Sequence, residues 1–329
     1  MKKFGYSRAA SLDEAVRSGL SQGARFIAGG TNLIDLMKEG VERPERLLDI
    51  TRLPLKEVLQ LPGGGLSLGA LVSNSAVADH PDVLRDYPLL AQALLSGASP
   101  QLRNLATVGG NLLQRTRCCY FYDLATVCNK RTPESGCAAL GGINRQHAIL
   151  GHSPACIAVH PSDMCVALAA LEAKVRVSGR DGDRLIPMAE FHRLPGQEPQ
   201  FDTVLETGDL ITAVELPAGS FSAHSAYLKL RDRASYAFAL VSVAAALRLE
   251  GEHIVEARLA LGGVAHRPWR VPAAEEALRG QRASLSAYNR AAEILLHGAQ
   301  GFEHNRFKIE LARRSIVRAC AQAAKGTAL

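Results

Sequence analysis

The feature that most limits how this chain can fold is a long stretch, residues 97–160, without helical or strand periodicity. It is rich in Gly, Asn, Arg and Cys, and so long an irregular stretch inside a compact domain is unusual and usually functional. A bound ligand that organises the stretch would explain why it has no core of its own. Five of the seven cysteines of the chain lie here: Cys118, Cys119, Cys128, Cys137 and Cys156.

Four of these cysteines are spaced Cys-x9-Cys-x8-Cys-x18-Cys, beginning at Cys118. This spacing differs from the tight C-x2-C pairs of zinc ribbons and bacterial ferredoxins, yet four thiolates are the usual complement of a [4Fe–4S] cluster. Unrelated core thiols or disulfides are the alternative. Side chains of neighbouring residues in extended backbone diverge, so Cys119 is expected not to share a cluster with Cys118. Cys165 and Cys320 fall in apolar helical segments and are expected to be core thiols.

Two Gly-Gly turns resemble each other: A-G-G-T-N-L (28–33) and T-V-G-G-N-L (107–112). Glycine lets the backbone approach a bulky anion, and successive N–H groups can surround phosphate oxygens. Thr31, Asn32 and Asn111 add side-chain hydrogen bonds. Neither turn matches a dinucleotide-binding or Walker motif, so ordinary glycine turns are the alternative. Together they predict a clamp for a pyrophosphate.

Three histidines, His147, His152 and His160, flank the cysteine-rich segment. They could donate hydrogen bonds to cluster sulfurs and so tune a cluster's potential. The alternative is that they are ordinary loop histidines. We leave them out of the predicted ligand set.

Composition excludes several classes of protein. A chain of 329 residues favours two or three domains, and 47% hydrophobic with 21% charged residues is typical of a globular protein. The net charge of +6 comes without a long basic run, so nucleic-acid binding is not expected. No apolar run approaches the ~20 residues of a membrane span. The N-terminus shows no signal peptide, which makes the cytoplasm the default compartment.

Hydrophobic patterning predicts elements of both kinds and places the main domain boundary at 217–219, Pro-Ala-Gly. A capping box, Ser11 to Glu14, begins the first helix. Expected helices are 11–20, 33–38, 88–95, 164–173, 272–279, 285–297 and 304–325. Expected strands are 24–28, 47–50, 66–72, 174–178, 210–216, 240–249 and 257–264.

These motifs occur in a sequence that resembles the FAD-binding medium subunit of the xanthine dehydrogenase/aldehyde oxidoreductase family of molybdenum hydroxylases. The resemblance runs nearly end to end. The cysteine insertion (about 115–158) is similar to that of bacterial periplasmic aldehyde oxidoreductases, whose flavin subunit carries a [4Fe–4S] cluster. The segments that carry the resemblance to the family are F-I-A-G-G-T-N-L (26–33), L-R-N-L-A-T-V-G-G-N-L-L-Q (102–114), H-P-S-D (160–163), G-D-L-I-T-A-V-E-L-P (208–217), R-D-R-A-S-Y-A-F-A-L-V-S-V-A (231–244) and L-G-G-V-A-H-R-P-W (261–269).

The resemblance implies the following site residues. Asp163 would lie near the polar chain of FAD, Ile211 near the isoalloxazine, and Lys229 would reach the cofactor. Each has an alternative, as a helix cap, a core residue and a solvated charge respectively. The cluster ligands would be Cys118, Cys128, Cys137 and Cys156. The pyrophosphate would be held by Phe26, Ile27, Ala28, Gly29, Gly30, Thr31, Asn32, Leu33, Ile34, Thr107, Gly110 and Asn111.

The fold that the resemblance implies is α+β: a vanillyl-alcohol-oxidase (PCMH)-type FAD-binding domain of two subdomains, 1–60 and 61–217, followed by an α+β domain, 218–329, like the C-terminal domain of the CO dehydrogenase flavoprotein. The implied activity is that of an oxidoreductase subunit without catalytic residues of its own. It would take electrons from the [2Fe–2S] clusters of a partner subunit and pass them from FAD to oxygen, a quinone or an electron-transfer protein.

The implied assembly is a heterotrimer, or its dimer, with a [2Fe–2S] subunit and a molybdenum-cofactor subunit that oxidises an aldehyde. A partner bearing a signal would carry the chain to the periplasm; otherwise it stays in the cytoplasm. Two alternatives remain: the flavin subunit of a 4-hydroxybenzoyl-CoA reductase-like complex, and a metal-stapled, basic, nucleic-acid-associated protein.

Overall fold

The N-terminal unit is a three-stranded parallel sheet with strand order β1-β3-β2. Parallel neighbours need a crossover connection, and a helix lies in each of the two connections. Ser11 begins the first helix as predicted, since its Oγ accepts a hydrogen bond from the Glu14 backbone N–H at 3.2 Å. This computed structural model describes residues 1–219 and 221–328. The elements of the unit are β1 (Gly5–Arg8), α1 (Leu12–Gly19), β2 (Ala24–Ile27), α2 (Leu33–Lys38) and β3 (Arg46–Asp49).

The second unit is built on a five-stranded antiparallel sheet with strand order β4-β5-β8-β6-β7. Its core is shared with a group of short helices, of which α9 is buried along its whole length. The strands are β4 (Val58–Gln60), β5 (Leu66–Gly69), β6 (Lys174–Gly179), β7 (Gly182–Pro187) and β8 (Leu210–Leu216). The helices are α3 (Asn74–Ala78), α4 (Pro81–Asp86), α5 (Pro88–Ser96), α6 (Pro100–Leu105), α7 (Val108–Leu112), α9 (Asp163–Ala170) and α10 (Met188–Phe191).

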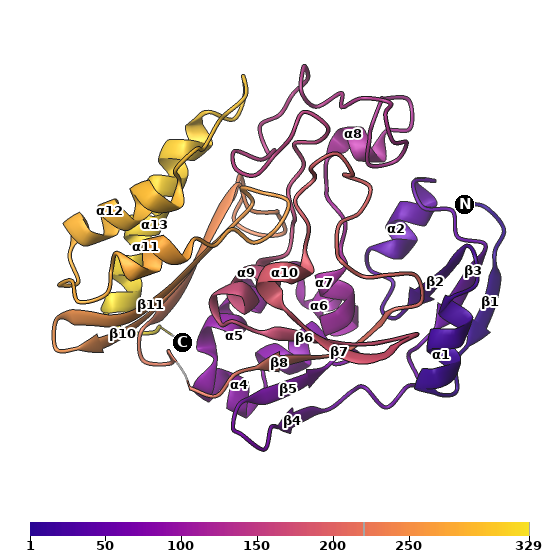
Figure 1. The fold of residues 1–329 in the computed structure, drawn as a ribbon, viewed down its shortest axis with the longest axis horizontal. Coiled ribbons are helices and arrows are strands. Elements are labelled where there is room, and N and C mark those ends of the chain that lie inside the picture. Colours follow the sequence, from indigo (N-terminus) through magenta and orange to yellow (C-terminus); the bar gives the residue numbers. More distant parts are fainter. Residues whose placement is uncertain (220, 329) are drawn as a thin grey trace.

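The stretch 97–160 is less irregular than expected. Its first part folds into α6 and α7, and α8 (Cys119–Tyr122) follows. Ser99 and Thr107 cap α6 and α7 with their side-chain oxygens. From residue 123 to 162 the described chain forms turns and isolated bridges only, including one between Cys128 and Cys137. In Figure 1 this cysteine-rich part projects above the sheet units together with α8.

The C-terminal domain is a three-stranded antiparallel sheet of order β11-β10-β9, covered on its outer side by helices (Figure 1). Alternate residues of β10 face opposite ways. Val243, Ala245 and Leu247 pack in the core of this domain, while Ala244 and Ala246 pack in the core of the second unit. The elements are β9 (Ser225–Leu230), β10 (Val241–Glu250), β11 (His253–Gly262), α11 (Pro272–Glu276), α12 (Leu285–Leu295) and α13 (Phe307–Ala324).

This architecture confirms the expected α+β class. Within the described ranges, no helix combines the length and apolar character that crossing a bilayer requires.

Candidate functional site

The first Gly-Gly turn connects β2 to α2. Gly30 has a φ of +69°, a conformation that favours glycine, and a side chain on Gly29 would collide with the backbone carbonyl of Leu105 at the end of α6. Asn32 then precedes α2, and its Oδ1 accepts a hydrogen bond from the Arg115 backbone N–H at 2.8 Å. The turn is therefore held against both α6 and the chain that follows α7.

The second Gly-Gly turn begins α7. Thr107 Oγ1 accepts a hydrogen bond from the Gly110 backbone N–H at 3.2 Å, and Gly109 N–H donates to the Ala70 carbonyl at 2.9 Å. Asn111 Oδ1 accepts from Ser162 Oγ at 2.6 Å. Because α7 is fixed in this way to the end of β5, its glycine backbone faces the first turn across a common space.

That space consists of two adjoining cavities, of about 280 and 580 Å³, which share Thr31, Asn32 and Gly110 in their walls. We call the two together the ligand groove. The predicted residues that line the smaller cavity are Phe26, Ile27, Ala28, Gly29, Gly30, Thr31, Asn32, Leu33, Thr107, Gly110 and Ile211. The larger cavity is lined by Asn111, Asp163 and Lys229 in addition to the shared residues. Ile34 is not in either wall; its side chain lies beside Gly30.

Two buried polar atoms in the wall of the larger cavity have no hydrogen-bond partner: Asn32 Nδ2 and Asn74 Oδ1. An unpaired buried donor or acceptor is costly, and such groups usually meet a ligand or water. A long ligand with a polar centre between two ring systems would satisfy both atoms as it passes the glycine turns. The groove therefore fits a dinucleotide such as FAD.

Asp163 and Lys229 form a buried ion pair in the wall of the larger cavity. Lys229 Nζ lies 2.7 Å from Asp163 Oδ2 and donates to the Ser96 carbonyl at 3.1 Å. Tyr227 Oη donates to Asp163 Oδ1 at 2.7 Å, and burial, followed by the charge of Asp163, raises the pKa of Tyr227 well above its usual value. The helix cap is Ser162 rather than Asp163. Ile211 lies in the other cavity, so the structure separates it from this pair.

Sequence reasoning missed an aromatic and cationic wall of the larger cavity, formed by Arg117, Arg233, Tyr236 and Phe238. The Arg117 guanidinium lies 5.2 Å from the centre of the Phe238 ring, and that of Arg233 lies 5.4 Å from the Tyr236 ring. Three of these residues belong to the 231–244 segment that carries the family resemblance. That segment was a usable signal, although it did not indicate which side chains face the ligand.

The four predicted cluster ligands come together. Cys118, Cys128, Cys137 and Cys156 line one small cavity, which we call the cysteine cavity. Cys119 is exposed and lines the ligand groove instead, as the divergence of neighbouring side chains predicts.

The remaining two cysteines, Cys165 and Cys320, are fully buried in the two main hydrophobic cores, which confirms them as core thiols. Burial raises the pKa of each thiol to about 12, so both stay protonated at neutral pH.

Protonation differs among the clustered thiols. Burial raises the pKa of Cys118 to about 12. Cys137 and Cys156 hydrogen-bond to each other, which lowers the pKa of Cys137 to about 6 and raises that of Cys156. The cysteine cavity thus places a readily ionised thiol beside protonated ones in a largely buried setting.

Sulfur spacing distinguishes two kinds of metal site. Tetrahedral coordination of one zinc ion, with Zn–S near 2.3 Å, sets the sulfurs roughly 3.8 Å apart. Within the described ranges, no three of these four cysteines have sulfurs that all lie within 4.8 Å of one another, although Cys137 and Cys156 hydrogen-bond to each other. The four thiols therefore do not have the arrangement of a tetrahedral site for one zinc ion.

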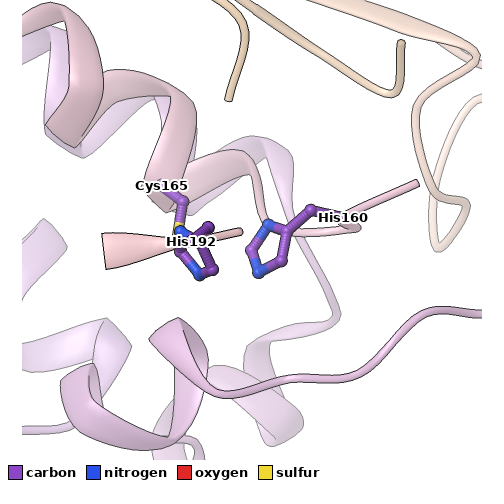
Figure 2. A group of neighbouring side chains, drawn as sticks. All are labelled: His160, Cys165 and His192. Carbon is purple, nitrogen blue, oxygen red and sulfur yellow. The ribbon is translucent and has the colours of Figure 1, made fainter. Parts of the chain in front are cut away.

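The close group is His160, Cys165 and His192, three buried side chains shown in Figure 2. The two rings lie 4.2 Å apart, and His192 Nε2 donates to the Leu112 carbonyl at 2.9 Å. Burial lowers the pKa of His192 to about 4 and that of His160 well below its usual value, so both rings are neutral at neutral pH. Structural zinc sites are almost always four-coordinate, and this group offers three donors. We interpret it as a polar contact within the core.

The ligand groove and the cysteine cavity are close neighbours. Thr116 and Cys118 line the cysteine cavity, while Arg117 and Cys119 line the groove. Arg115, just before them, donates to Glu42 Oε1 at 2.6 Å and to Asp202 Oδ2 at 2.9 Å. This network ties the cysteine-rich segment to the N-terminal unit and to the strand connection before β8.

Comparison with known proteins gives a consistent result. The family described as the FAD binding domain in molybdopterin dehydrogenase matches residues 2–219, and the CO dehydrogenase flavoprotein C-terminal domain matches residues 225–323. The chain is 50% identical to the aldehyde oxidoreductase FAD-binding subunit PaoB of Escherichia coli K12 over 325 residues, covering 98% of this chain and 99% of that protein. It is 29% identical to the glyceraldehyde dehydrogenase medium chain of Sulfolobus acidocaldarius, covering 85% and 82%.

Solved structures resemble the whole chain. Carbon monoxide dehydrogenase from Hydrogenophaga pseudoflava superposes with a TM-score of 0.76 at 26% identity, covering 98% of this chain and 97% of that one. Quinoline 2-oxidoreductase from Pseudomonas putida 86 gives a TM-score of 0.75 at 27% identity, covering 99% of both chains.

Proposed function

Because this chain belongs to the FAD-binding medium subunits of the molybdenum hydroxylases, an oxidoreductase family, we propose that it is the electron-transfer subunit of a molybdenum-dependent aldehyde oxidoreductase. The observation that carries the proposal is the ligand groove, whose two cavities meet at two Gly-Gly turns. The likeness to the PaoB subunit supports an aldehyde as the substrate of the complex.

FAD would supply the redox chemistry of this subunit, and the chain supplies the binding site. The glycine backbones of both turns would face the pyrophosphate, and the unpartnered amide atoms of Asn32 and Asn74 would receive its polar neighbours. Lys229 neutralises Asp163 inside the larger cavity, so the groove presents no isolated buried charge to the cofactor. The site residues therefore bind and orient, and the proposal needs no acid or base from this chain.

The partners in the proposal are a [2Fe–2S] subunit that delivers electrons and a molybdenum subunit that oxidises the aldehyde, with an external acceptor (oxygen, a quinone or an electron-transfer protein) taking the electrons away. The relatives' designations as medium chains and as an FAD-binding subunit support such an assembly. Those names describe one component among several, and this chain spans 99% of the FAD-binding subunit that it matches at 50% identity.

The finer part of the proposal is a [4Fe–4S] cluster on Cys118, Cys128, Cys137 and Cys156. Two observations support it: the four thiols line one cavity, and the segment that carries them has little regular structure of its own. A bound cluster would organise that segment as metals do in other small metal-dependent regions.

The visible spectrum of the purified complex, before and after dithionite, tests both parts. We expect flavin bands together with a broad shoulder near roughly 400 nm that bleaches on reduction. Cys137→Ser should lose part of the shoulder and the iron of one [4Fe–4S] cluster, with the [2Fe–2S] contribution remaining, while Cys119→Ser, the adjacent-cysteine control, should match the wild type. A complex that binds no FAD would refute the function, and flavin bands with only the iron of the [2Fe–2S] clusters would refute the [4Fe–4S] cluster alone.

A further inference from the structure

We propose that His147 is a positioning residue that raises the reduction potential of the cysteine-bound cluster by donating its Nε2–H to the sulfur of Cys118. The inference rests on the proposed cluster and goes beyond it, because it assigns the potential to a residue that is not a ligand.

The contact is direct. His147 Nε2 lies 3.1 Å from Cys118 Sγ, inside the range of hydrogen bonds to sulfur, and the residue is only 5% exposed. The other ring nitrogen, Nδ1, is buried without a partner. Of the two ring nitrogens, Nε2 is the one with a hydrogen-bond partner, and that partner is the Cys118 sulfur.

The C-terminal domain fixes the position of the ring through its backbone. The His147 carbonyl accepts hydrogen bonds from Lys308 Nζ at 2.7 Å and from Asn305 Nδ2 at 3.2 Å, while His147 N–H donates to Asn144 at 3.0 Å. Lys308 is fully buried and also donates to the Gly263 carbonyl at 2.6 Å. These bonds fix the backbone of His147, and the burial of the residue limits where its ring can lie.

The ligand chemistry decides the direction of the contact. A thiolate at Cys118 can only accept a hydrogen bond, so the ring nitrogen that faces it, Nε2, carries the proton in the cluster-bound protein.

A hydrogen bond to a ligand sulfur stabilises the more negative, reduced state of a cluster more than the oxidised state, and hydrogen bonds to the sulfurs are among the factors that set cluster potentials. Removing this donor should lower the midpoint potential. A tenfold fall in the ratio of reduced to oxidised cluster at a fixed potential corresponds to about 59 mV for one electron.

The test is a redox titration of the complete complex, followed by the electron paramagnetic resonance signal of the reduced cluster. His147→Leu should lower the midpoint potential by about 59 mV, which corresponds to a tenfold fall in the ratio of reduced to oxidised cluster. His147→Gln keeps an N–H donor and should restore most of the difference. His152→Leu is the matched control. His152 lies in the same segment, and its ring faces Phe302 at 4.9 Å rather than a cysteine.

A second measurement needs no variant to fold. In protein labelled with ¹⁵N-histidine, the reduced cluster should show a weak hyperfine coupling to one nitrogen, and His147→Gln should abolish it. An unchanged midpoint in His147→Leu, or an absent nitrogen coupling in the wild type, would overturn the inference while the cluster stands. Absence of a [4Fe–4S] signal beside those of the [2Fe–2S] clusters in the wild type would instead overturn the proposed cluster.

Discussion

The buried pair of Lys229 and Asp163 makes a sharp test of how the C-terminal domain holds the ligand groove. The two side chains are 5% and 8% exposed, and they join β9 to the start of α9. Lys229→Met keeps most of the side-chain volume and removes the charge, leaving the Asp163 carboxylate buried with the Tyr227 hydroxyl as its remaining side-chain hydrogen bond.

Breaking a buried ion pair by removing one partner typically costs about 3–5 kcal/mol, because the other charge stays buried and uncompensated. The Tyr227 hydrogen bond remains, so we expect a loss near the lower limit, about 3 kcal/mol in the free energy of unfolding. Asp163→Asn combined with Lys229→Met removes both charges and should recover more than half of that loss.

Urea unfolding followed by the fluorescence of Trp269, the one tryptophan in the sequence, measures these differences. FAD content is measured on the same samples. A double variant that regains stability but not FAD would show that the charged pair also contacts the cofactor. A loss below about 1 kcal/mol in Lys229→Met, the range of a solvent-exposed pair, would refute the reasoning from burial.

Three further predictions concern the glycine turns, the cysteines and Lys308. Gly29→Ala should reduce the FAD-to-protein absorbance ratio at least tenfold, because its methyl group meets the Leu105 carbonyl, whereas Gly63→Ala, with open space around the new carbon, should leave it unchanged. Iron analysis should show Cys128→Ser losing iron and Cys320→Ser, in the C-terminal core, retaining it. Burial lowers the pKa of Lys308 to about 7, below its unfolded value near 10.4. The unfolded chain therefore binds more protons than the folded chain between these pH values. The free energy of unfolding should rise with pH from 7 to 10, by at most about 1.4 kcal/mol per pH unit. Urea titrations measure this rise, and Lys308→Met should lack the contribution.

The parts of the fold that were predictable are those in which local chemistry decides the structure. The capping box at Ser11, the strand before Gly29 and the helix after Asn32 follow from adjacent residues, and the structure confirms them. β10 was also recognisable as a long apolar run, because it is buried on both faces.

The missed elements lack such local signals. β7, G-D-R-L-I-P, is an exposed edge strand with one buried residue, so its pattern does not alternate cleanly. α6 and α7 have six and five residues, too few turns to show a helical period. Their caps, Ser99 and Thr107, were the available evidence.

The same distinction applies to the candidate site. Residues 26–33 line the groove as one continuous segment around a single turn. A local feature of this kind can be predicted from a sequence motif. The Asp163–Lys229 pair and the ring of His147 on Cys118 depend on contacts between units far apart in the chain, and sequence alone does not show which charges or rings meet.

The short segment from Thr116 to Cys119 connects the two halves of the candidate site. Its residues alternate: Cys118 faces the cysteine cavity, while Arg117 and Cys119 face the ligand groove. Side chains point in alternate directions along an extended backbone, and residues 114–118 belong to no helix or strand. A cluster on Cys118 and a cofactor against Cys119 would therefore be separated by one peptide unit and its side chains. If the cluster exchanges electrons with the cofactor across this short distance, Cys137→Ser should lower acceptor reduction while FAD is retained; loss of folding in this variant would instead show that the cysteines have a structural role.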